Sequence, residues 1–68
     1  MTTYYFDKEN NFLYKHEHLH GLAFDDAVEL VEKNLQINPY TYKAIVTSKT
    51  KGKCEITKKM EINKKFIK

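Results

Sequence analysis

The chain has 68 residues, of which 12 are Lys and 9 are Asp or Glu, so its formal net charge is +3. This length supports a single small domain over residues 1–68 with a thin core, and such domains often rely on a partner chain for stability. A homodimer is therefore expected. The single cysteine, Cys54, excludes an internal disulfide and is typical of a reducing compartment. With no signal peptide and no apolar run near the ~20 residues of a membrane span, we expect a cytoplasmic protein that does not interact with membranes.

The charges are unevenly distributed along the chain. Residues 1–42 contain three lysines and seven acidic residues, whereas residues 43–68 contain nine lysines and two acidic residues. The net charges of the two parts are therefore −4 and +7. Any binding hypothesis has to state which of these parts it uses.

The first twenty residues predict a β-hairpin. Thr2–Phe6 is rich in Thr, Tyr and Phe, which favour strands, and Phe12–Leu19 is a second candidate strand. Asp7–Asn11 between them is a polar turn. Gly21 separates this hairpin from the segment that follows.

The segment Leu22–Leu35 predicts an amphipathic helix. Its apolar stripe, which needs a sheet to pack on, comprises Phe24, Ala27, Val28, Val31 and Leu35. The opposite face carries Asp25, Asp26, Glu29, Glu32 and Lys33. Ala23 stands where a Ser or Thr cap is expected, so the start is weakly capped, and Asn34 is a candidate C-terminal stop.

The C-terminal part predicts a second hairpin. Pro39 blocks continuation of the helix, Tyr40–Ser48 alternates as a third strand, and Lys49–Lys53 is a turn. Cys54–Ile62 is a fourth strand that has Cys54, Ile56, Met60 and Ile62 on one side and is interrupted at Lys58 by a bulge or an edge position. Residues 63–68 are predicted to form a frayed basic tail.

This order predicts an α+β fold, β-β-α-β-β, with a four-stranded, mainly antiparallel sheet and one helix packed on one face. The other face would present Tyr, Thr and Lys side chains. A second copy of the chain or another partner could add to that face or to a strand edge.

Two groups of polar residues resemble catalytic or metal sites. His16, His18 and His20 would project from one face of a strand, as ligands of a divalent metal such as zinc do, but a partly solvated polar strand face has the same pattern. The helix acids could be catalytic carboxylates, although on an exposed helix face they are more typical of solvated surface. We therefore assign no catalytic residue, no metal site and no cofactor, and expect a protein that is not an enzyme.

Nucleic-acid binding is one functional hypothesis. The lysines of the C-terminal half could contact phosphates while Tyr40 and Tyr42 stack on bases. Alternating Lys and Thr on an exposed strand is also ordinary solubilising surface.

A second functional hypothesis comes from a resemblance over Thr3–Val46. This stretch begins with a strand, an acidic amide-rich turn and a second strand that contains Tyr, His and Glu17. A helix opening follows, of the form Gly21-Leu22-Ala23-Phe24-Asp25-Asp26. In this order and spacing the chain resembles the small uracil-DNA glycosylase inhibitors of podoviruses that infect Bacillus. The resemblance implies a phage protein that acts in the host cytoplasm as a homodimer and blocks DNA repair by mimicking DNA in the groove of the enzyme.

The resemblance also implies which residues bind the partner. Glu17 matches the functional strand glutamate of the family. Where the family places an aromatic, an acid and a tyrosine, this chain has Ala27, Val28 and Val31, and its acids fall at nearby helix positions. The residues predicted to bind a DNA-processing enzyme are Glu17, Asp26, Val28, Glu29, Val31 and Glu32.

Overall fold

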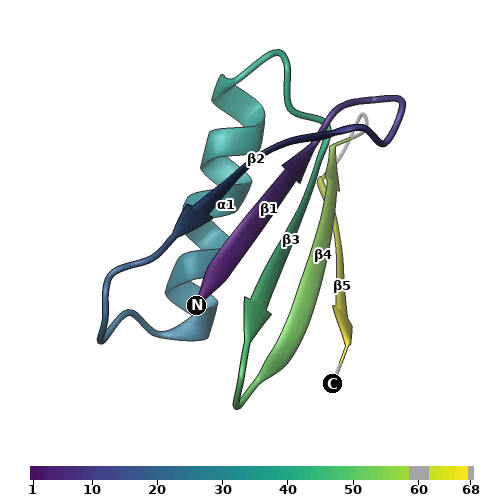
Figure 1. The fold of residues 1–68 in the computed structure, drawn as a ribbon. Coiled ribbons are helices and arrows are strands. Elements are labelled where there is room, and N and C mark those ends of the chain that lie inside the picture. Colours follow the sequence, from purple (N-terminus) through teal and green to yellow (C-terminus); the bar gives the residue numbers. More distant parts are fainter. Residues whose placement is uncertain (59–61, 68) are drawn as a thin grey trace.

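The computed structural model describes residues 1–58 and 62–67, which form one helix and one antiparallel sheet. The strands are β1 (Thr2–Phe6), β2 (Phe12–Glu17), β3 (Lys43–Ser48), β4 (Gly52–Lys58) and β5 (Ile62–Ile67), and the helix is α1 (Phe24–Ile37). In space the strand order is β2-β1-β3-β4-β5, with α1 across one face (Figure 1). The predicted α+β class, with one helix on one face of an antiparallel sheet, is confirmed.

The number of strands differs from the prediction, because the sheet has five strands rather than four. Residues 62–67, for which the sequence predicts the end of a strand and a frayed tail, instead form β5 along the outer edge of β4. Phe66 of β5 packs against Phe24 of α1 with ring centroids 6.2 Å apart, and Lys64 forms a 3.1 Å ion pair with Glu32. These contacts are tertiary, so the local sequence of lysines around one phenylalanine gave no strong sign of a strand. The predicted core position Met60 lies outside the described residues.

The hairpin of β1 and β2 is closed by Asp7. Its Oδ1 accepts hydrogen bonds from the backbone N–H groups of Glu9 at 3.0 Å and Asn11 at 2.8 Å. The hydrogen bond from the Asn11 backbone, and to a lesser extent that from Glu9, lowers the pKa of the exposed Asp7 carboxyl below its ordinary value. Asn10 adopts φ +68°, which Asn tolerates better than most residues. Strand β2 ends at Glu17, two residues before the predicted end.

Helix α1 begins at Phe24 with Ala23 as its N-cap, and no side chain caps it, as predicted. It continues past Asn34 to Ile37, where the backbone N–H of Asn38 donates to the carbonyl of Asn34 at 2.9 Å. The predicted stop at Asn34 was therefore three residues early, because Pro39 is what prevents further turns. Within the described residues, no helix is long and apolar enough to span a membrane.

The core lies between α1 and the helix-facing side of β1, β3 and β4. It consists of Tyr5, Ala27, Val28, Val31, Leu35, Ala44, Val46, Cys54 and Ile56. The two buried threonines are both hydrogen-bonded: Thr41 Oγ1 donates to the carbonyl of Asn38 at 3.2 Å, and a 2.6 Å bond joins Thr3 Oγ1 to His18 Nε2. Four of the five predicted stripe residues are fully in this core, and Phe24 packs at its edge.

Candidate functional site

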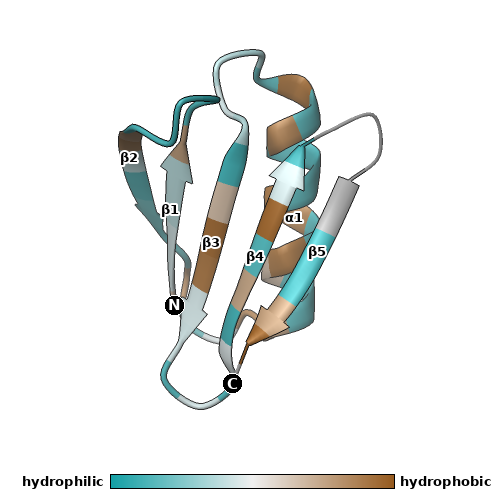
Figure 2. Cartoon of the chain, turned by 90° about the vertical axis from the view of Figure 1, so that its right-hand side faces the viewer, coloured by the Kyte–Doolittle hydropathy of each residue, from teal (hydrophilic) through white to brown (hydrophobic). Residues whose placement is uncertain are grey.

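One face of the sheet is covered by α1, and Figure 2 shows the opposite face with α1 behind the strands. Because side chains alternate along a strand, the neighbours of core residues Tyr5, Ala44 and Ile56 project to that opposite face. We call it the open face. Its side chains come from Thr2, Tyr4, Phe6, Phe12, Lys15, Glu17, Lys43, Ile45, Thr47, Lys53, Glu55, Thr57, Lys65 and Ile67.

Three aromatic rings gather on the open face over β1 and β2, and we call them the aromatic cluster. The Phe12 ring centroid lies 6.4 Å from that of Tyr4 and 6.0 Å from that of Phe6, in tilted and edge-on arrangements. Phe12 is 56% exposed, and Ile45 of β3 stands opposite Tyr4 in the register. The fold therefore displays an apolar aromatic surface outside its core.

Lysines surround this cluster. Lys15 is the cross-strand partner of Tyr4, and the Lys43 ammonium lies 4.8 Å from the Phe6 ring centroid while it also donates a hydrogen bond to the side chain of Asn10. Lys53 and Lys65 extend the basic surface over β4 and β5. With Glu17 and Glu55 as the acids, the described side chains of the open face carry four positive and two negative charges, a net of +2.

The outer surface of α1 has the opposite charge. Asp25, Asp26 and Glu29 are exposed, and Glu32 is half-buried in its ion pair with Lys64. The helix itself contains four acidic residues and one lysine, Lys33, a net of −3. The helix is thus net negative, and the described side chains of the open face are net positive.

The residues predicted to bind a partner do not form one surface. Val28 and Val31 are 2% and 0% exposed because they are part of the core, so neither side chain lies on the surface of the folded chain. Asp26 and Glu29 are exposed on α1. Glu17 pairs with Thr2 on the open face, so the sheet separates it from the helix acids.

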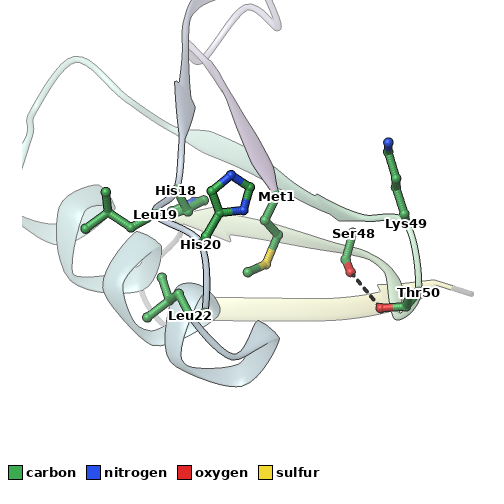
Figure 3. A pocket seen from close by; sticks show the side chains of 9 residues that line it. Met1, His18, Leu19, His20, Leu22, Ser48, Lys49 and Thr50 are labelled. Atoms are coloured by element: carbon green, nitrogen blue, oxygen red, sulfur yellow. Dashed lines mark hydrogen bonds between the residues drawn. The ribbon is translucent and has the colours of Figure 1, made fainter.

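The histidines are only partly brought together. His16 and His18 lie edge to face with ring centroids 4.8 Å apart, and burial and then the charge of His16 lower the pKa of His18. His20 lies beyond β2 and lines a cavity of about 260 Å³ with Met1, Ser48 and Thr50 (Figure 3). No group of three potential metal ligands was found among the residues that the structure describes.

The aromatic cluster was missed by reasoning from the sequence, which chose Tyr40 and Tyr42 as stacking residues. Tyr40 is 80% exposed in the connection before β3, away from any strand. The available signal was the alternation within Thr2–Phe6, which places Tyr4 and Phe6 on one side and Tyr5 on the other.

No protein-family model, curated protein or solved structure matches this chain. The resemblance over Thr3–Val46 thus stays a prediction from the sequence.

Proposed function

We propose that this protein is a non-enzymatic nucleic-acid-binding protein that contacts the phosphate backbone through its open face. The observation that supports this proposal is a set of lysines spread over an uncovered sheet face, which also holds Glu17 and Glu55, next to the aromatic cluster with its exposed Phe12 ring. Lys15, Lys43, Lys53 and Lys65 come from four different strands. At ~4.8 Å between neighbouring strands, they extend over roughly 19 Å from β2 to β5.

The separation of charge between the layers favours one binding orientation. A polyanion that approaches the open face meets four lysines, whereas Asp25, Asp26 and Glu29 lie on the far side of the protein. Each phosphate neutralised by a lysine releases condensed counterions, which makes the affinity fall with salt. The net charge of +3 adds a weak attraction at long range.

The lysines can be tested with two double variants of equal charge. We expect K53Q/K65Q to weaken binding of labelled DNA or RNA and to reduce the slope of log affinity against log salt by about 1.4, since two phosphate contacts are lost at ~0.7 each on a single strand. The control K33Q/K64Q removes the same charge from the helix side. Fluorescence anisotropy over a range of salt concentrations measures the slope.

The control variant also separates specific contacts from net charge. If K33Q/K64Q reduced the slope as much as K53Q/K65Q, the lysines would act only through total charge and the open face would not be the binding surface. Absence of any binding at low salt would refute the proposal. Because Lys64 pairs with Glu32, circular dichroism has to show that both variants are folded.

A second candidate function is inhibition of uracil-DNA glycosylase or a related DNA-processing enzyme by mimicry of DNA. Its support is the exposed acidic surface of α1, with Asp25, Asp26 and Glu29 directed away from the sheet. Carboxylates placed this way are complementary to a basic enzyme groove and would accelerate association. Val28 and Val31 contribute nothing to this surface.

A uracil-excision assay distinguishes mimicry from sequestration of the substrate. Mimicry predicts inhibition at stoichiometric excess that is relieved in D26N/E29Q and retained in K53Q/K65Q. Sequestration of DNA by the open face predicts the reverse pattern. Unchanged excision in the presence of excess wild-type protein would eliminate the inhibitor hypothesis.

A further inference from the structure

We infer that the open face selects single-stranded over double-stranded nucleic acid, with unpaired bases stacked on the aromatic cluster. This inference rests on the proposed function and specifies its ligand. The lysines alone would accept any polyanion, so the argument for a single strand comes from the aromatic rings.

The aromatic cluster offers exposed ring surface where the fold does not need it. Phe12 is on edge strand β2, 56% exposed, and contacts Tyr4 and Phe6 rather than the core. Unpaired bases stack on such side chains whatever their sequence, because every base has a π face. Lys15 and Lys43 flank the rings, so a strand with bases on the cluster has cations within reach of its phosphates.

Lys43, held by Asn10, lies where base stacking on the rings and phosphate contacts with the lysines would meet. The Lys43 ammonium lies over the edge of the cluster, 4.8 Å from the Phe6 ring centroid, and is held there by the Asn10 side chain. Asn10 is in turn fixed in the hairpin by the neighbouring Asp7 cap. A cation is thereby positioned beside a stacking ring before any ligand arrives, which reduces the ordering required on binding.

A duplex cannot use this arrangement. Its bases are stacked on one another, and its major groove, about 12 Å wide, admits a helix or a two-stranded ribbon. Five strands at ~4.8 Å spacing form a face roughly 19 Å wide, which is too broad to enter the groove. A duplex could therefore touch the lysines through its backbone but could not reach the aromatic cluster with its bases.

A second copy of the chain is a less suitable occupant of this face. Pairing two open faces would oppose two surfaces that each carry four lysines and two glutamates among their described side chains. Like charges brought together this way repel, whereas a polyanion neutralises them. Charge complementarity thus favours a nucleic-acid strand over self-association through this face.

The test compares two phenylalanines of nearly equal exposure on opposite sides of the sheet. Phe12 is 56% exposed on the open face, and Phe66 is 57% exposed on the helix side. We expect Phe12→Ala to weaken binding of a single-stranded oligonucleotide about 5- to 100-fold, the loss typical of one stacked base, and Phe66→Ala to change it less than about 2-fold. Phe12→Leu keeps the apolar contact with β1 but removes the ring, so it should also weaken binding.

Competition measures the preference for strand class. Unlabelled single-stranded DNA should displace a labelled single strand at least ~10-fold better than the duplex of the same sequence. If single strand and duplex competed equally and Phe12→Ala bound as tightly as wild type, the inference would be refuted. The proposed function would still stand if binding depended on the lysines. Failure of both nucleic acids to bind would refute both. A stable dimer that Phe12→Ala converts to monomer would show that a second copy occupies the face, which also overturns the inference.

Discussion

Replacement of Leu35 by Ala is expected to lower the free energy of unfolding by about 2–5 kcal/mol, because it leaves a cavity in the core. Leu35 is 0% exposed and is one of the largest fully buried side chains of the described chain. A domain of this length has a total stability of roughly 3–10 kcal/mol. The variant should therefore lose a large part of its stability, with a fall in Tm of about 4–8 °C for each kcal/mol.

The matched control is Leu30→Ala, which is the same substitution in the same helix. Leu30 is 47% exposed on the outer side of α1, so its truncation removes little buried surface and should cost less than about 1 kcal/mol. Urea unfolding, followed by the circular dichroism of the helix at about 222 nm, measures the free energy of unfolding of both variants. Equal destabilisation by the two variants would mean that α1 does not pack on the sheet by the face described.

The Cys54 thiol is expected to react with a thiol reagent at least ~10³-fold more slowly in the native protein than in the unfolded chain. Cys54 is 0% exposed on β4 beneath α1, so the reagent reaches it only when the core opens. The factor corresponds to an opening free energy of about 4 kcal/mol, at the low end for a small domain. Burial also raises the pKa of the thiol, which reduces the reactive thiolate at any given pH.

The labelling rate of Cys54 is compared with two references. The rate in high urea supplies the unprotected reference, and the rate for Leu35→Ala should exceed that for Leu30→Ala because the first variant opens the same core more often. Rapid labelling of the native wild-type protein would contradict the burial of Cys54. Labelling rates that did not change with Leu35→Ala would show that Cys54 becomes exposed by a local motion of β4 and β5 instead.

The periodicity of the chain predicted most of the fold. The helical spacing of Ala27, Val28, Val31 and Leu35 identified the core side of α1, and the alternation through Ala44, Val46, Cys54 and Ile56 reflects the facing side of the sheet. These predictions succeeded because burial of one face imposes a period of about 3.6 on a helix and 2 on a strand. The end of α1 was less predictable, since Asn34 is acceptable both within a helix and at its end.

The composition of the candidate site was harder to predict. Phe12 lies in a strand whose residues are all exposed, so no burial pattern indicates on which side its ring lies. The ring joins Tyr4 and Phe6 because the register between β1 and β2 shifts between Tyr5 and Phe6. The sequence predicted one binding site containing Glu17 and the helix acids, because they are close in sequence and alike in charge. In the structure they lie on opposite sides of the sheet.

The sequence by itself determined the α+β class, the helix and its buried stripe, the two hairpins and the uneven charge along the chain. These depend on local periodicity, turn chemistry and composition. Only the tertiary structure decided that residues 62–67 add a fifth strand and that Phe6 and Phe12 join Tyr4 in one cluster on the open face. Those features arise from pairing between distant strands, where a single step in register moves a side chain from one face of the sheet to the other.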